Sequence, residues 1–226
     1  MIDGKATEGR SRDAGGVAIE LWFASGNQGK TNEMKMLLNR LISAGRLKLH
    51  TQNELPVFSQ PPENGDSFVA NARIKARALK SVKSGVWVIA EDSGLAVEGL
   101  GGLPGIHSAR YAGPKASDGE NIAKLLKMMT IRPMNSRKGA FISTIVAFDP
   151  EGKEYVFDGR MEGEIAKAAR GTQGFGYDSV FIPEGETKTL AELGIAFKNK
   201  VSHRAKAVTQ FMEVLEGPKG PSATPD

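Results

Sequence analysis

The feature that most restricts the fold is the run VWVIA at 86–90, which is apolar at every position instead of every second one. A strand with this pattern is buried on both faces, as happens when helices cover both sides of a sheet. Glu91 and Asp92 follow the run directly. Open α/β sheets bind ligands at the carboxyl ends of such strands, so the run predicts an α/β fold and a candidate site together.

Strand and helix patterns alternate along the first half of the chain. The strand-like runs are rich in β-branched and aromatic residues, and the helix-like segments repeat apolar residues at intervals of three and four positions. Capping residues mark helix starts: Asp66 opens one segment, and Ser117 with Glu120 forms a capping box for another. The expected elements are strands at 17–24, 46–51 and 86–90, and helices over 34–42, over 67–83 and after Ser117.

The second half is richer in strands. Two apolar segments at 139–149 and 153–159 flank the turn signal at 150–152, which predicts a hairpin. Strands joined by a hairpin are antiparallel, whereas the alternating first half favours parallel pairing, so we expect an α/β fold with a mixed sheet. The remaining expected elements are strands at 162–166 and 179–183 and a last helix after Ser202.

No repeat, linker or change of composition divides the chain of 226 residues. We therefore expect a single α/β domain over 17–216, between a flexible N-terminal tail at 1–16 and a flexible C-terminal tail at 217–226. Both tails mix glycine, proline, charged and small polar residues without a hydrophobic period.

Composition excludes several classes of function. The chain has no cysteine, which rules out disulfides and a thiolate nucleophile and is compatible with a reducing, cytoplasmic location. The formal net charge of +4 suits an anionic ligand, but the lysines are spread along the chain, so we expect no nucleic-acid partner. No apolar run approaches the roughly 20 residues of a membrane span, so we expect no membrane association.

The bend in FASGNQGKT, at 23–31, is the first candidate ligand site. A helix N-terminus, the Ser25 hydroxyl, the Asn27 amide and the Lys30 ammonium all suit a phosphate chain. One alternative is a Walker A loop, followed by the apolar run and Asp92 as a Walker B, but Ala24 stands where the first Walker glycine belongs. A capped helix start with a solvated lysine is the other alternative.

Three later segments add candidate chemistry. The glycine-rich stretch 91–113 begins with two carboxylates, and Asp92 can accept a proton from water or bind Mg²⁺. The segments 171–179 and 198–207 combine aromatic and cationic side chains, which suit a nucleobase and its phosphates. His50, His107 and His203 lack the spacing of a metal site.

Taken together and in this order, four motifs resemble the inosine triphosphate pyrophosphatase family, the house-cleaning enzymes also described as dITP/XTP pyrophosphatases. The motifs are SGNQGK, EDSGLAVEGLGGLPGIHSARYAG, GFGYDSVFIPEG and KNKVSHRAKA, and the resemblance runs from about residue 19 to 216. It implies an elongated mixed β-sheet flanked by helices, two lobes around a substrate cleft, and a homodimer. It also implies Mg²⁺-dependent hydrolysis of ITP, dITP and XTP to the monophosphate and pyrophosphate.

The resemblance also implies roles for individual residues. Asp92 is the implied proton acceptor and a metal ligand, and Lys198, Arg204 or a backbone amide can donate to the 6-keto group that adenine lacks. The residues implied to bind substrate are Ser25, Gly26, Asn27, Gln28, Gly29, Lys30, Ser93, Phe175, Gly176, Tyr177, Asp178, Lys198, His203 and Arg204.

One departure from the family pattern bears on activity. The family usually carries glutamate, as a second metal ligand, where this chain has Ala70. The loss of a carboxylate is expected to weaken Mg²⁺ binding. Glu91 is a candidate substitute, although neighbouring strand residues point to opposite faces. A nucleotide-binding protein with impaired catalysis is therefore the alternative function. Ser179, where proline is common in the family, is expected to matter little.

Overall fold

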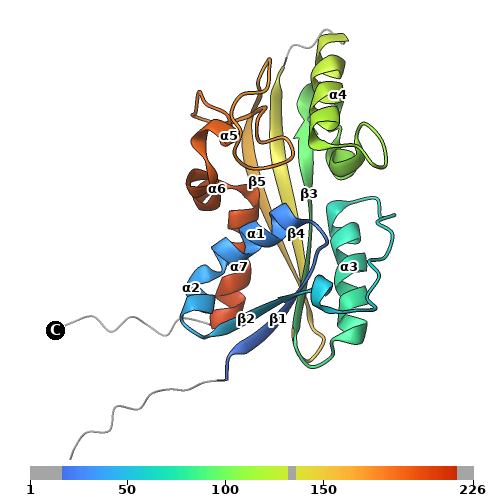
Figure 1. Cartoon of the computed structure of the whole chain (residues 1–226), viewed down its shortest axis with the longest axis vertical. Helices are drawn as coiled ribbons and strands as arrows, with labels where there is room; N and C mark the ends of the chain where they lie inside the picture. Colours follow the sequence, from blue (N-terminus) through green and yellow to red (C-terminus); the bar gives the residue numbers. More distant parts are fainter. Residues whose placement is uncertain (1–16, 132–135, 218–226) are drawn as a thin grey trace, which may run out of the picture.

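The computed structural model describes residues 17–131 and 136–217, which form a mixed six-stranded sheet flanked by helices (Figure 1). The expected fold class is confirmed, and the two expected tails lie outside the described residues except for Gly217. The strands are β1 Ile19–Ala24, β2 Leu47–Thr51, β3 Trp87–Val97, β4 Lys138–Phe148, β5 Glu154–Ile165 and β6 Phe181–Pro183, in the order β2-β1-β3-β4-β5-β6. The β2-β1-β3 part is parallel, and β3 to β6 pair antiparallel.

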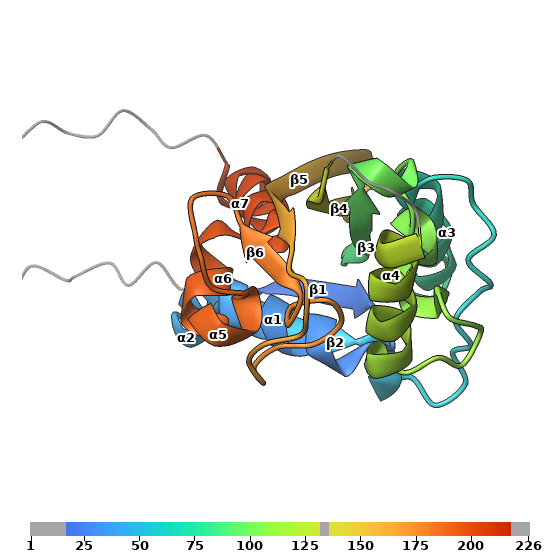
Figure 2. The same cartoon turned by 90° about the horizontal axis from the view of Figure 1, so that it is seen from above.

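Helices cover both faces of the sheet, as the all-apolar run predicted. Figures 1 and 2 show α3 and α4 on one side and the other α-helices on the opposite side. The helices are α1 Gln28–Leu37, α2 Asn39–Ser43, α3 Phe68–Val82, α4 Asp118–Ile131, α5 Leu190–Leu193, α6 Ile195–Val201 and α7 His203–Glu216, with 3-10 turns η1 Gln52–Glu54, η2 Glu98–Leu100 and η3 Gly105–Arg110. None of the helices in the described part of the chain is long and apolar enough to cross a membrane.

Strand β3 is longer than the apolar run that predicted it. We expected Glu91 and Asp92 to follow the strand, and this expectation is wrong, because β3 continues to Val97. The antiparallel neighbour β4 supplies backbone partners along the whole extension, with Asp92 opposite Thr144. The polar side chains therefore sit in the middle of a rigid ladder instead of on a loop.

The pleat of β3 sends alternate residues to different helices. Val88 and Ala90 pack in the core cluster beneath α3, whereas Ile89 packs in the cluster formed with α1 and α7. Side chains two positions apart share a face of a strand. Asp92 therefore lies on the face that packs against α3, and Glu91 lies on the face that packs against α1 and α7. Two adjacent carboxylates are thereby directed into different surroundings.

The start of α3 differs by one residue from the expected position. Ser67, not Asp66, is the N-cap, and its hydroxyl oxygen accepts a hydrogen bond of 3.3 Å from the backbone N–H of Ala70. Serine and aspartate are both good caps, so the sequence alone did not separate two neighbouring candidates. The capping box of Ser117 and Glu120 ahead of α4 is confirmed.

Candidate active site

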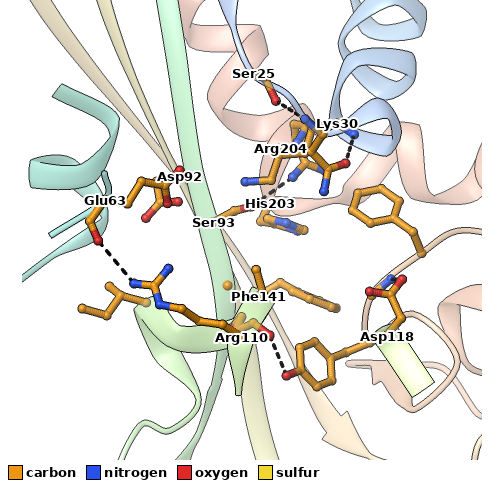
Figure 3. A pocket seen from close by; sticks show the side chains of 18 of the residues that line it. Ser25, Lys30, Glu63, Asp92, Ser93, Arg110, Asp118, Phe141, His203 and Arg204 are labelled. Carbon is orange, nitrogen blue, oxygen red and sulfur yellow. Dashed lines mark hydrogen bonds between the residues drawn. The ribbon is translucent and has the colours of Figure 1, made fainter. Parts of the chain in front are cut away.

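A cavity of about 440 Å³ brings the four sequence motifs together (Figure 3). Of the residues implied to act on substrate, those lining the cavity are Ser25, Gly26, Asn27, Lys30, Asp92, Ser93, Phe175, Gly176, Tyr177, Asp178, Lys198, His203 and Arg204. Gln28 and Gly29 do not line it. Gly29 instead makes room for a neighbour, because a Cβ atom built on it would lie 2.7 Å from the Phe175 ring.

The bend before α1 is held in shape by its own polar groups. The Asn27 side-chain oxygen accepts from the Lys30 N–H at 3.0 Å, and the Ser25 hydroxyl oxygen accepts from the Asn27 N–H at 3.2 Å. Asn27 is thus the N-cap of a ten-residue helix whose amino end faces the cavity. Such a terminus attracts anions through its free N–H groups and its dipole.

Asp92 stands beside a second carboxylate and a buried lysine. The Lys75 ammonium lies 3.3 Å from Asp92 Oδ1 and 3.1 Å from Glu63 Oε1. Asp92 Oδ2 is buried without a hydrogen-bond partner in the described part of the chain. Burial raises the pKa of Asp92, and the charges of Lys75 and Lys30 only partly oppose this effect. Asp92 is therefore a stronger base than an exposed aspartate.

Glu91 belongs to a different ion cluster, as the pleat dictates. It is 2.9 Å from the Lys30 ammonium and 3.0 Å from the Arg204 guanidinium, and it accepts from the Ser143 hydroxyl. Burial alone would raise the pKa of Glu91, but the charges of Arg204 and Lys30 hold it well below its ordinary value. Glu91 therefore stays ionised and orients the two cations.

The aromatic end of the cavity is built around Phe175. The Lys198 ammonium lies 4.5 Å and the Arg204 guanidinium 5.8 Å from the centre of its ring. Lys198 pairs with Asp178 at 2.5 Å and with Glu33 at 2.7 Å, and Glu33 also pairs with Arg204. These contacts fix both cations beside a ring that can stack on a base.

His203 is neutral in this arrangement. Its ring stacks on Phe141 at a centroid distance of 4.8 Å and an interplanar angle of 9°. Burial lowers the pKa of His203 well below its ordinary value, and the neighbouring charges of Arg204 and Lys198 lower it further. His203 thus contributes shape and a polar edge to the cavity, not a positive charge.

The comparisons with known proteins agree on one family. A model of the Ham1 family matches residues 21–214. The chain belongs to the Ham1 family. A dITP/XTP pyrophosphatase of Bdellovibrio bacteriovorus is 56% identical over 198 residues, which cover 88% of this chain and 98% of that protein.

Solved Ham1 structures share the fold. A HAM1 protein from Coxiella burnetii matches with a TM-score of 0.78 and 37% identity, over 88% of this chain and 98% of the other. The Staphylococcus aureus Ham1 protein matches with a TM-score of 0.75 and 39% identity, over 88% and 100% of the two chains.

Two carboxylates in the Ham1 cavity suit a divalent cation. No group of three or more histidine, aspartate and glutamate side chains in the described ranges can hold a metal ion by itself. Asp92 and Glu63 nevertheless share one ammonium, and Asp92 keeps a buried oxygen without a partner. Mg²⁺ is commonly held by one or two carboxylates together with substrate phosphates and water, so the pair fits such an ion.

Ala70 does not line the cavity. It occupies the third position of α3, where its N–H is capped by Ser67. A glutamate at this position can accept a hydrogen bond from the backbone N–H of the serine cap and so complete a capping box. In this Ham1 chain the second carboxylate near Asp92 comes from Glu63, on the segment ahead of α3.

Several functional candidates were missed from the sequence. Lys75 could have been recognised as a buried charge from the sequence, because it lies between Ala72 and Leu79 on the apolar face of α3. Glu33 could have been recognised in the same way, but less clearly, because it lies on the buried side of α1. Glu63 lies on an irregular segment and Arg110 ends the short 3-10 turn η3, and at neither place does a periodicity mark an inward-facing side chain.

Proposed function

We propose that this chain hydrolyses the non-standard purine nucleoside triphosphates ITP, dITP and XTP to the monophosphate and pyrophosphate. The observation that carries the proposal is one cavity with two chemically different ends. One end has a buried carboxylate, the other has an aromatic ring flanked by cations, and the amino end of α1 also lines the cavity. Its Ham1 relative in Bdellovibrio is named a dITP/XTP pyrophosphatase, and this supports the same reaction here.

The aromatic end suits a 6-keto purine. Among the described residues, Arg204 Nε is a buried donor without a partner and Asp178 Oδ1 is a buried acceptor without one. Hypoxanthine and xanthine present an acceptor at O6 and a donor at N1–H, which matches this pair. Adenine presents the opposite polarity and would leave both buried groups unpaired, at a cost of about 1–3 kcal/mol each.

Asp92 is the proposed proton acceptor. Its raised pKa and its free oxygen support abstraction of a proton from the water that attacks the α-phosphorus. Lys30 and the amino end of α1 are the proposed phosphate-binding groups, as expected from the sequence. Family membership favours this assignment over the Walker A alternative.

Mg²⁺ is the proposed cofactor, with Asp92 and Glu63 as its protein ligands. The cations around the cavity are Lys30, Lys75, Arg110, Lys198 and Arg204, and the carboxylates that line it or pair with them are Glu33, Glu63, Glu91, Asp92, Asp118 and Asp178. The carboxylates thus outnumber the cations by one before any triphosphate binds. Mg²⁺ would supply the positive charge that neutralises the phosphates.

Product analysis tests the proposal. With ITP and Mg²⁺ we expect IMP and pyrophosphate, separated by anion exchange; IDP and orthophosphate would instead indicate attack at the γ-phosphorus and refute it. Asp92→Asn is expected to lower kcat by about 10²–10⁴-fold, as for loss of a general base. The control is Asp158→Asn, an exposed aspartate on β5, which should leave kcat unchanged.

Three further predictions concern assembly, location and partners; the first comes from the resemblance and the other two come from composition. They are a homodimer, a cytoplasmic location, and the absence of nucleic-acid and membrane partners. Light scattering of the purified chain tests the first of them, and a monomeric mass would contradict it.

A further inference from the structure

Arg110 differs from the other cations that line the cavity. Lys30, Lys75, Lys198 and Arg204 each have a carboxylate oxygen within 3.3 Å. Within the described ranges Arg110 forms no ion pair, and its guanidinium donates only a long bond of 3.4 Å to the backbone oxygen of Glu63. A guanidinium stays charged at any pH at which proteins fold, so the cavity contains one positive charge without an opposite partner.

The element that carries Arg110 is fixed from three sides. In η3, the Ser108 hydroxyl accepts from the Leu95 N–H of β3 at 2.8 Å, and the Tyr177 hydroxyl donates to the Ser108 carbonyl at 2.9 Å. The Asn121 side chain of α4 donates to the Ala109 carbonyl at 3.2 Å and accepts from the Ala112 N–H at 2.8 Å. The backbone around Arg110 is therefore held before any ligand arrives, which lowers the entropy cost of binding one.

The close approach of η3 to the sheet depends on a glycine. A Cβ atom on Gly94 of β3 would lie 2.3 Å from the Gly105 carbonyl oxygen and 2.5 Å from the Ser108 hydroxyl. Only glycine lets the turn lie this near the strand that carries Asp92. The glycine at position 94 of β3 therefore allows η3, and with it Arg110, to lie close to the strand that carries Asp92.

The side chain of Arg110 points to the carboxylate end of the cavity. Figure 3 shows it extending toward Glu63 and Asp92 and away from Asp118. The aromatic ring proposed to hold the base lies at the other end, beside Lys198. A nucleotide whose base stacks on Phe175 therefore directs its phosphates toward the guanidinium.

We propose that Arg110 binds the β and γ phosphates of the substrate and stabilises them as they leave as pyrophosphate. This inference rests on the proposed function. In the reaction, the water oxygen bonds to the α-phosphorus and a water proton passes to Asp92. The bond from the α-phosphorus to the bridging oxygen breaks, and its electron pair leaves on pyrophosphate. Arginine can contact two phosphate oxygens at once, and the contact strengthens as negative charge builds up there.

Product inhibition separates this role from a general effect on the cavity. In Arg110→Gln the inhibition constant of pyrophosphate should rise by about 10- to 100-fold, the loss expected for charged hydrogen bonds. The inhibition constant of IMP, which lacks the β and γ phosphates, should stay within about 3-fold and also reports that the cavity is intact. The inhibition constant of pyrophosphate in Arg110→Lys should lie between those of the wild type and Arg110→Gln. A lysine keeps the positive charge but cannot contact two phosphate oxygens at once as a guanidinium does. Arg160→Gln, at an exposed arginine on β5 paired with Glu162, is the matched control.

Two results would overturn the assignment. Unchanged pyrophosphate inhibition in Arg110→Gln would show that the guanidinium does not contact these phosphates, and an equal loss for IMP and pyrophosphate would indicate a structural role. Calorimetric titration of pyrophosphate with Mg²⁺ into the wild-type protein and the variant needs no turnover. It therefore tests Arg110 even if the wild-type chain fails to hydrolyse ITP, a failure that would refute the proposed function alone.

Discussion

The buried carboxylate of Glu33 holds the two cations at the base end in place. One of its oxygens lies 2.7 Å from the Lys198 ammonium, the other pairs with the Arg204 guanidinium, and the residue is 6% exposed. Glu33→Gln keeps the shape of the side chain but removes its charge and turns one acceptor into a donor. That donor then faces a cation that is itself a donor.

The cost follows from the contacts that remain. Removing one partner of a buried ion pair costs about 3–5 kcal/mol. Lys198 keeps Asp178 and Arg204 keeps Glu91, so neither cation is left alone. We therefore expect Glu33→Gln to lower the free energy of unfolding by about 3 kcal/mol, near the lower limit of that range. The KM for ITP should also rise, because both cations are proposed to position the base.

Urea unfolding followed by circular dichroism measures the loss of stability. The control is Glu213→Gln, at an exposed glutamate on α7, which should change the free energy of unfolding by less than about 0.5 kcal/mol. A loss in Glu33→Gln below about 1 kcal/mol would refute the reasoning. It would mean that the remaining carboxylates satisfy Lys198 and Arg204 without Glu33.

Two further predictions concern stability. Ala70→Glu should raise the free energy of unfolding by about 0.3–1.5 kcal/mol by completing the capping box with Ser67, while kcat changes by less than about 3-fold; a tenfold gain in kcat would instead place residue 70 in metal binding. Because the pKa of His203 is lowered in the folded chain, the unfolded chain binds a proton near pH 6.5 that the folded chain does not bind. The free energy of unfolding is therefore unaffected by this group above that pH and decreases as the pH falls below it. Between pH 7.5 and 5.5 the wild type should lose about 1 kcal/mol more than His203→Asn in urea unfolding, and identical pH profiles would contradict a buried neutral histidine.

The sequence predicted the fold class well because apolar periodicity reports which faces are buried. The all-apolar run at 86–90 required helices on both sides of the sheet, and this is what surrounds β3. The same signal failed at the end of the strand. Residues 91–94 are polar, small or glycine, and only their pairing with β4 keeps them in the ladder. Pairing between distant segments is not visible in local periodicity.

The candidate site was predictable where its residues lie in distinctive motifs. Most of the residues implied by the resemblance line one cavity. The pleat then separates Glu91, which orients Lys30 and Arg204, from Asp92, which keeps a free oxygen. Glu63 was not predictable, because a residue on an irregular segment reaches the cavity only through tertiary contacts such as its pair with Lys75.

The most direct test of the account compares pyrophosphate release from ITP, XTP and ATP by the wild-type chain with Mg²⁺. The unpaired donor of Arg204 and acceptor of Asp178 predict that kcat/KM for ITP and XTP exceeds that for ATP by at least about 100-fold. Equal values for ATP and ITP would contradict the proposed recognition of the 6-keto group. Release of no pyrophosphate from any of the three would contradict the proposed reaction itself.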